Sequence, residues 1–166
     1  MDRNELQKIQ TPLKERYSDD PEAALITLEA EGRLDENLVS CSVSTGRALI
    51  EAGLHPATGG TGMLACSGDM LLQALVACAG VTLRAVATSL GLGVAGSVHA
   101  EGDLDFRGTL GVDKETPVGF TAIRLLFDLE HDASEEQIEK LLELTRRYCV
   151  VYQTLAGGVP VELGLG

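Results

Sequence analysis

The sequence has no tryptophan, and aromatic residues make up only 4% of its 166 positions. Hydrophobic residues still account for 45% of the chain, a normal share for a globular protein. We therefore expect a core of leucine, valine and alanine, which suits close helix packing and often a shared interface. A chain of this length fits one domain better than two.

Positive charge is also scarce. Thirteen lysines and arginines stand against 25 aspartates and glutamates, a formal net charge of −12. Phosphate backbones and anionic lipid surfaces repel such a chain, so we expect no nucleic-acid partner and no membrane partner. The charge is interpreted as a solubility feature.

The first residues contain no apolar h-region, so the sequence predicts no secretory signal peptide and a cytoplasmic location. In that reducing compartment four cysteines are not expected to form a disulfide framework. They are expected to be free, metal-bound or redox-active. The cysteines are Cys41, Cys66, Cys78 and Cys149.

One stretch, residues 70–90, is apolar enough to raise the question of a membrane span. It contains Arg84 and Gln73, and an arginine near a bilayer centre costs about 3 kcal/mol on insertion scales. A core helix that is apolar nearly all round is the better interpretation.

Motifs for metals, nucleotides and hydrolases are missing. The sequence has no C-x-x-C, and His55, His99 and His131 are scattered without ligand spacing. Residues 60–65 match G-x-G-x-x-A, but no apolar strand precedes them and the following helix begins too late. A P-loop and a G-x-S-x-G elbow are absent. We therefore expect no metal and no cofactor, and nucleotide binding is the weakest of the hypotheses.

Hydrophobic periodicity predicts strands before a long helix and more strands after it. The long helix is expected to begin at Ser67 or Asp69 as N-cap and to end near Gly91 or Gly93. Ser134 and Gln137 form a capping box for a second helix, which extends to about residue 148. This order favours α+β over a parallel α/β sheet. The other expected elements are a helix at 3–16 interrupted near Pro12, strands at 24–32, 38–46, 47–52, 94–107, 120–130 and 159–163, a hairpin turn at 32–37, loops at 53–68 and 108–119, and a short helix at 151–155.

Two cysteines stand in positions where chemistry is plausible. Cys78 lies in the middle of the long helix among apolar neighbours, where a free cysteine also serves as a small buried hydrophobe. Cys149 follows Arg146 and Arg147 and precedes a short helix, and both features favour a thiolate. Its alternative role is to fill a corner between helices. Cys41 and Cys66 have no basic neighbour in sequence; Cys41 is interpreted as filler, and Cys66 is left open.

Two cysteine motifs resemble those of the OsmC/Ohr family. The first is GDMLLQALVAC at residues 68–78, followed by GVTLRAVA, and it resembles the family's central-helix motif. The second is RYCVVYQTL at residues 147–155. Residues 103–111 and 117–120 resemble the linker of the OsmC-like branch. The resemblance runs from about Pro21 to the C-terminus.

This resemblance implies an α+β fold whose antiparallel sheet wraps around a long central helix in an intertwined homodimer. Residues 1–166 would form a single OsmC-like domain, with residues 1–20 as an N-terminal helical extension. Characterised members reduce organic hydroperoxides, and some reduce hydrogen peroxide. Carried over, Cys78 would be the attacking thiolate and Cys149 the resolving thiol. Sulfenic acid and disulfide are reversible steps of cysteine oxidation, and an external dithiol would reduce the disulfide.

The resemblance also implies an arginine and often a carboxylate beside the attacking thiol. Arg47 matches the arginine, although a solvated strand-end residue is the alternative. Asp69, nine residues before Cys78, lies near the position of the family's glutamate and equally suits a helix N-cap. Val150 departs from the proline that many relatives have there. The alternative function is a non-catalytic homodimer that binds a small apolar ligand near Cys78.

Overall fold

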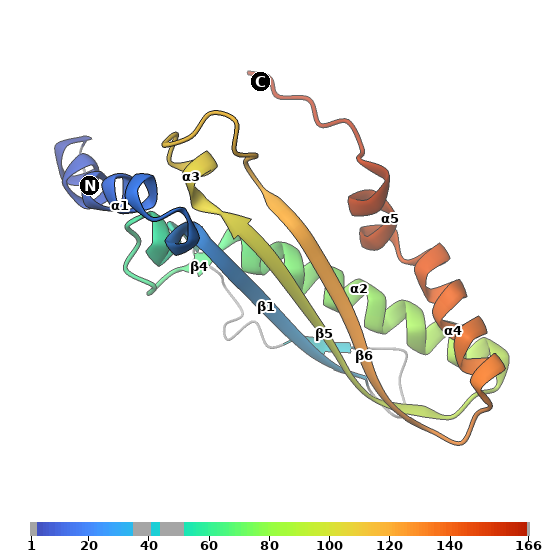
Figure 1. The fold of residues 1–166 in the computed structure, drawn as a ribbon. Helices are drawn as coiled ribbons and strands as arrows, with labels where there is room; N and C mark the ends of the chain where they lie inside the picture. Colours follow the sequence, from blue (N-terminus) through green and yellow to red (C-terminus); the bar gives the residue numbers. More distant parts are fainter. Residues whose placement is uncertain (1–2, 35–40, 44–51, 166) are drawn as a thin grey trace. The chain divides into compact units, whose positions relative to one another are not determined.

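The computed structural model describes residues 3–34, 41–43 and 52–165. Their contacts define two compact units, which are described separately. The sheet strands β1, β5 and β6 and the long helix α2 have residues in both units (Figure 1). The prediction of one domain therefore stays a prediction. The first unit contains residues 1–30, 44–73 and 99–126, and the second contains residues 31–43, 74–98 and 127–166.

The main sheet has four strands in the order β2-β1-β5-β6. Strand β1 pairs with β2 in antiparallel fashion, with Gly32 opposite Val43 and Leu34 opposite Cys41. This pairing confirms the two predicted strands, but residues 32–34 belong to β1, so the turn predicted at 32–37 is wrong at its start. Positions 35–40 and 44–51, with most of the strand predicted at 47–52, lie outside the described residues. The strands are β1 (Leu25–Leu34), β2 (Cys41–Val43), β5 (Val94–Asp105) and β6 (Phe120–His131).

Strands β5 and β6 are also antiparallel. Gly96 lies against the carbonyl of Asp128 at one end of the pair, and the Thr121 hydroxyl donates to the carbonyl of Asp103 at the other. Paired residues are therefore closer together in sequence near the connection between the two strands, as in an antiparallel pair. Gly96 has φ +129, and a Cβ there would lie 2.0 Å from the Asp128 oxygen, so only glycine fits. The predicted strands at 94–107 and 120–130 are confirmed.

Helix α2 (Ser67–Leu90) is the longest element. It ends before Gly91, whose φ of +69 is the expected glycine stop. It begins at Ser67, so Ser67 and Asp69 both lie inside its first turn. The prediction that one of them is the N-cap is therefore wrong. Its buried residues confirm an aliphatic core and include Leu72, Leu75, Val76, Ala79, Leu83 and Ala87.

Helix α2 is long and apolar enough to cross a bilayer by length and composition, a test that core helices of soluble proteins also pass. Only 44% of the most apolar 18-residue stretch of α2 is buried by the rest of the chain. A helix that is hydrophobic nearly all round normally buries most of its surface, so part of this helix lacks a covering layer among the described residues.

In the first unit, α1 (Arg3–Asp19) continues through Pro12, so the predicted interruption is wrong. Tyr17 anchors this helix, since its side chain is buried and its hydroxyl donates to the Ala57 carbonyl at 2.6 Å. The two predicted loops also contain short elements. They are η2 (Pro56–Thr58), α3 (Phe106–Thr109) and the parallel pair β3 (Ala52–Gly53) and β4 (Ala65–Cys66), while η1 (Pro21–Ala24) follows α1.

In the second unit, α4 (Glu135–Tyr148) begins with the predicted capping box, and both of its reciprocal hydrogen bonds are present. Helix α5 (Val150–Gly157) confirms the predicted short helix. The predicted strand at 159–163 is wrong, because residues 159–165 have no secondary structure. Val161 and Leu163 are almost fully exposed, and no described strand supplies the ladder hydrogen bonds that a strand needs.

Candidate active site: a hydrogen-bonded thiol pair

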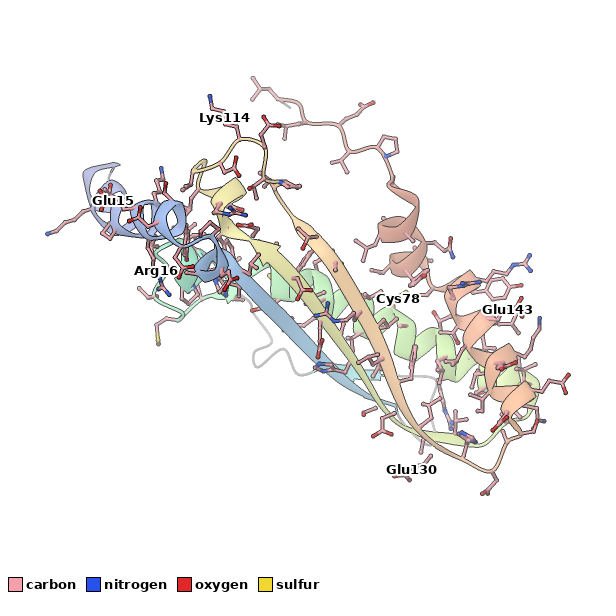
Figure 2. The ribbon with its side chains drawn as sticks, in the orientation of Figure 1. Glu15, Arg16, Cys78, Lys114, Glu130 and Glu143 are labelled. Atoms are coloured by element: carbon pink, nitrogen blue, oxygen red, sulfur yellow. The ribbon has the colours of Figure 1, made fainter. Side chains whose placement is uncertain are left out.

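The second unit brings together two cysteines from distant parts of the sequence. Cys78 lies on α2 (Figure 2), and Cys149 lies between α4 and α5. Each thiol shifts the pKa of the other, so the two sulfurs lie side by side. Cys149 is only 1% exposed, whereas Cys78 is half-buried. Both are free thiols in this structure.

Cys149 forms the corner between α4 and α5. Its backbone is extended, with φ −72 and ψ 107, and it serves as the C-cap of α4 and the N-cap of α5. Its N–H donates to the Thr145 carbonyl at 2.9 Å, and its own carbonyl accepts from Gln153 N–H at 2.9 Å. Cys149 thus caps both helices, and its place in the corner sets the direction of its side chain.

Four neighbouring polar groups lower the pKa of Cys78. They are the backbone N–H of Val151, the thiol of Cys149, the hydroxyl of Thr82 and the backbone N–H of Val150. Burial by itself raises the pKa of Cys78, but these hydrogen bonds outweigh it and lower the pKa below its ordinary value. Cys78 is therefore the thiol of the pair that ionises first.

Cys149 shows the opposite shift. Burial is the largest cause, and the negative charge and hydrogen bond of Cys78 add to it, so the pKa of Cys149 is raised to about 11. The N–H of Tyr152 donates to the Cys149 sulfur at 3.4 Å and offsets part of this rise. At neutral pH Cys149 keeps its proton and donates it to the Cys78 sulfur.

The expectation that Arg146 and Arg147 would ionise Cys149 is wrong. The guanidinium of Arg147 lies over the Tyr148 ring, 5.4 Å from its centroid, and burial dominates the pKa of Cys149. The predicted contribution of a helix N-terminus is present, but the N–H groups at the start of α5 also lower the pKa of Cys78.

The other predicted site residues do not join this pair among the described residues. Arg47 lies outside the described part of the chain. Asp69 lies in the first turn of α2; burial raises its pKa, and attraction to His55 lowers it in part. Cys41 belongs to β2, and its side chain is outside the description. Cys66 is free and half-buried in β4.

An apolar groove adjoins the thiol pair in the same unit. Its volume is about 410 Å³, and Thr82 belongs both to its lining and to the hydrogen bonds of Cys78. The lining has no Asp, Glu, Lys or Arg. The lining residues are Val81, Thr82, Ala85, Val86, Ser89, Leu90, Leu144 and Tyr148.

Sequence reasoning gave no role in the site to the Thr82 hydroxyl or to the backbone N–H groups of Val150 and Val151. The spacing of four residues between Cys78 and Thr82 puts them one helical turn apart and could have identified Thr82. The two valines contribute through the backbone, which no side-chain motif reveals.

Within residues 3–34, 41–43 and 52–165, no three His, Cys, Asp or Glu side chains are placed to hold a metal ion. The Gly-rich match at 60–65 precedes β4 rather than following a strand into a helix, so it lacks the strand–turn–helix context of a dinucleotide site.

Comparisons with known proteins agree with the fold. The family model for OsmC-like proteins matches residues 60–164. A crystal structure of an OsmC-like hydroperoxide resistance protein from Jannaschia sp. CCS1 aligns with a TM-score of 0.52 at 15% identity, covering 84% of this chain and 91% of that chain. No curated protein matches the sequence. The α+β prediction, with an antiparallel sheet and a long central helix, is confirmed.

Proposed function

The chain belongs to the OsmC-like family, and on that premise we propose that it is a thiol peroxidase that reduces organic hydroperoxides through Cys78 and Cys149. The observation that carries this proposal is the close approach of the two thiols, with a lowered pKa on Cys78 and a raised pKa on Cys149. The structural similarity to a hydroperoxide resistance protein supports the fold on which it depends.

In the first step the Cys78 thiolate attacks one oxygen of the hydroperoxide. The O–O bond breaks, the alkoxide leaves and takes up a proton as alcohol, and Cys78 becomes a sulfenic acid. The lowered pKa of Cys78 supports this role, because the thiolate and not the thiol is the nucleophile.

In the second step Cys149 condenses with the sulfenic acid. A disulfide forms between Cys78 and Cys149, and water leaves. The close approach of the two thiols supports this step, because it places the resolving sulfur beside the attacking one. An external dithiol then exchanges with the disulfide and restores both thiols.

The groove supports an organic substrate over hydrogen peroxide. It adjoins Cys78 through Thr82, and its lining is apolar and free of charged side chains. A hydroperoxide with an uncharged alkyl or aryl group gains binding energy by burying that group there. Hydrogen peroxide has no such group.

A second copy of the chain is part of the proposal. Helix α2 is buried over less than half of its most apolar window, and Leu71, Val81 and Leu90 are exposed on it. A partner subunit would cover this surface, and sedimentation of the purified protein tests for the dimer.

Arg47 and Asp69 enter the proposal through the family resemblance. Nine residues along an α-helix correspond to about 13 Å and two and a half turns, so Asp69 and Cys78 belong to opposite faces of α2. An Asp69–Arg47 pair would therefore serve the thiol of the other subunit. Arg47→Ala should slow peroxide consumption. Asp69→Asn should slow it as well, whereas Asp69→Glu, which keeps the carboxylate, should not.

The test of function is peroxide consumption with dihydrolipoamide as reductant. We expect Cys78→Ser to lower the rate with cumene hydroperoxide by at least about a hundredfold, because the nucleophile is lost. Cys149→Ser should allow one turnover and then accumulate sulfinic acid on Cys78. The matched control, Cys66→Ser, should keep the wild-type rate. Equal rates for wild type and Cys78→Ser would refute the proposal.

The alternative function is a non-catalytic homodimer that binds an apolar ligand, and the same groove favours it. Binding of a fluorescent fatty-acid probe, competed by apolar ligands and unchanged in Cys78→Ser, would support it if wild type consumes no peroxide. Peroxide consumption by wild type that is lost in Cys78→Ser would favour the peroxidase.

A further inference from the structure

The corner between α4 and α5 leaves a carbonyl at the end of α4 to be satisfied. In an uninterrupted helix the Val150 N–H would donate to the carbonyl of Arg146, four residues earlier. The extended backbone at Cys149, with ψ 107, ends α4 before that bond. The Arg146 carbonyl accepts instead from the side-chain amide of Gln153, whose Nε2 lies 2.8 Å away. A side chain of α5 thus takes the place of a backbone donor at the end of α4.

Gln153 contacts the chain on both sides of Cys149. Its side chain donates to Arg146, three residues before Cys149, and its own N–H donates to the Cys149 carbonyl at 2.9 Å. The last carbonyls of one helix and the first N–H groups of the next both need partners. One residue in the first turn of α5 therefore serves both ends of the corner.

The two helices that meet at the corner are held unequally. On the α4 side, the Cys149 N–H donates to the carbonyl of Thr145. Thr145 is buried, and its hydroxyl donates to the carbonyl of the buried Leu141. On the α5 side, none of the eight residues is buried. A helix this short is marginal by itself, so the orientation of α5 depends on polar contacts such as the bond from Gln153.

The place of the Cys149 sulfur depends on that orientation. The sulfur accepts the Tyr152 N–H at 3.4 Å and so caps the first turn of α5. A rotation of α5 about the corner would move this donor and change the direction in which the sulfur points. The bond from Gln153 to α4 opposes such a rotation.

We propose that Gln153 is a positioning residue: its side-chain amide holds α5 on the end of α4 and so keeps the Cys149 sulfur within reach of Cys78. The inference deepens the proposed function and rests on it, since Cys149 is there the resolving thiol. In that step the Cys149 sulfur attacks the sulfenic sulfur of Cys78. The S–S bond forms, the S–O bond breaks, and hydroxide leaves with the thiol proton as water.

A misplaced Cys149 has a chemical consequence that can be measured. As long as the sulfenic acid persists, a second hydroperoxide can transfer an oxygen to it, which gives sulfinic acid on Cys78 and a second alcohol. Disulfide and sulfinic acid are therefore competing products, and their ratio reports how fast Cys149 resolves. The attack of Cys78 on the first hydroperoxide precedes this competition, so its rate should not depend on Gln153.

The variants separate the hydrogen bond from the position. Gln153→Met removes the amide and keeps an unbranched side chain of good helix propensity; Gln153 is exposed, so no core packing is lost. Gln153→Lys keeps a donor for the carbonyls at the end of α4. The matched control is Thr154→Ala, because Thr154 is also exposed and its hydroxyl donates to the Val150 carbonyl at 2.8 Å, within α5 and not across the corner.

The first measurement is the product ratio. Reduced full-length protein is treated with increasing amounts of cumene hydroperoxide without reductant, remaining thiols are blocked with iodoacetamide, and the Cys78 peptides are quantified by mass spectrometry. We expect Gln153→Met to give equal amounts of disulfide and sulfinic acid at about three- to tenfold less hydroperoxide than wild type, the loss expected for one hydrogen bond. Gln153→Lys and Thr154→Ala should stay close to wild type. All four proteins should consume the first equivalent at the same rate, which a folding defect would not allow.

A second measurement needs no peroxide. Equilibration with mixtures of reduced and oxidised glutathione gives the effective concentration of the Cys149 thiol at Cys78. It should fall about three- to tenfold in Gln153→Met and remain at the wild-type value in Thr154→Ala. A Gln153→Met protein that matches Thr154→Ala in both measurements, or a Gln153→Lys protein that is as impaired as Gln153→Met, would overturn the inference.

The inference and the proposed function fail separately. A wild-type protein that consumes no hydroperoxide, but whose effective concentration falls in Gln153→Met, would remove the function and leave the positioning role of Gln153. Peroxide consumption through the disulfide, with the same product ratio and the same effective concentration in Gln153→Met and Thr154→Ala, would remove the inference alone.

Discussion

At the scale of single residues, the two thiols of the pair have pKa values shifted in opposite directions. Cys149 has the basic neighbours and the helix start, yet burial raises its pKa to about 11. Cys78 looks like a helix-core residue in sequence, yet it receives the donors and its pKa is lowered. Burial and main-chain direction depend on tertiary packing, so one-dimensional proximity to Arg146 and Arg147 could not assign the reactive sulfur.

Val150 illustrates the same limit. In the sequence, the valine at position 150 stands out only because many relatives have proline there. Its N–H lowers the pKa of Cys78, an effect that depends on the packing of the second unit. A backbone donor is present in every residue except proline, so sequence alone cannot distinguish the ones that matter.

Thr82 gives a prediction at this scale. Thr82→Val keeps the shape of the side chain and removes the hydroxyl that donates to Cys78. The pKa of Cys78 should rise, and its alkylation at pH 7 should slow by about three- to tenfold. Thr82→Ser keeps a hydroxyl and should react at nearly the wild-type rate. A Thr82→Val protein that is indistinguishable from Thr82→Ser would contradict the assignment.

At the scale of elements, local rules predicted the boundaries that depend on local chemistry. The capping box at Ser134 and Gln137 and the glycine stop after Leu90 are both observed. Local rules failed where the outcome depends on neighbours. Helix α1 continues through Pro12, and the alternation at 159–163 forms no strand, because alternation without a paired neighbour leaves ladder hydrogen bonds unmade.

The close approach of β5 to β6 gives a prediction about stability. A Cβ at Gly96 would lie 2.0 Å from the Asp128 oxygen, at a φ of +129. Gly96→Ala should lower the free energy of unfolding by about 2 kcal/mol or more, because the strands must separate. Gly91→Ala is the matched control: its φ is also positive, but nothing lies within 4 Å of the added Cβ. It should cost only about 1 kcal/mol.

Urea denaturation followed by circular dichroism measures both variants. The excess loss in Gly96→Ala over Gly91→Ala reports the steric contact between the strands. Equal losses would mean that β5 and β6 do not approach at Gly96.

At the scale of the whole molecule, the family and the fold class could be predicted from the sequence, because two cysteine motifs and their helix contexts are encoded in residue order. The pairing of the two sulfurs follows from the fold, since Cys78 and the α4–α5 corner are far apart in sequence and belong to the same unit. The partner subunit proposed for the exposed surface of α2 depends on a second chain, which no single sequence describes.

The central claim is that Cys78 and Cys149 act on peroxide as one pair, and disulfide mapping tests it most directly. Reduced protein is treated with one equivalent of cumene hydroperoxide, digested and examined by mass spectrometry without reductant. We predict a Cys78–Cys149 disulfide within one chain as the main product, and sulfenic acid on Cys78 in Cys149→Ser. Full consumption of the peroxide without a Cys78–Cys149 disulfide, or no oxidation of Cys78 at all, would contradict the account.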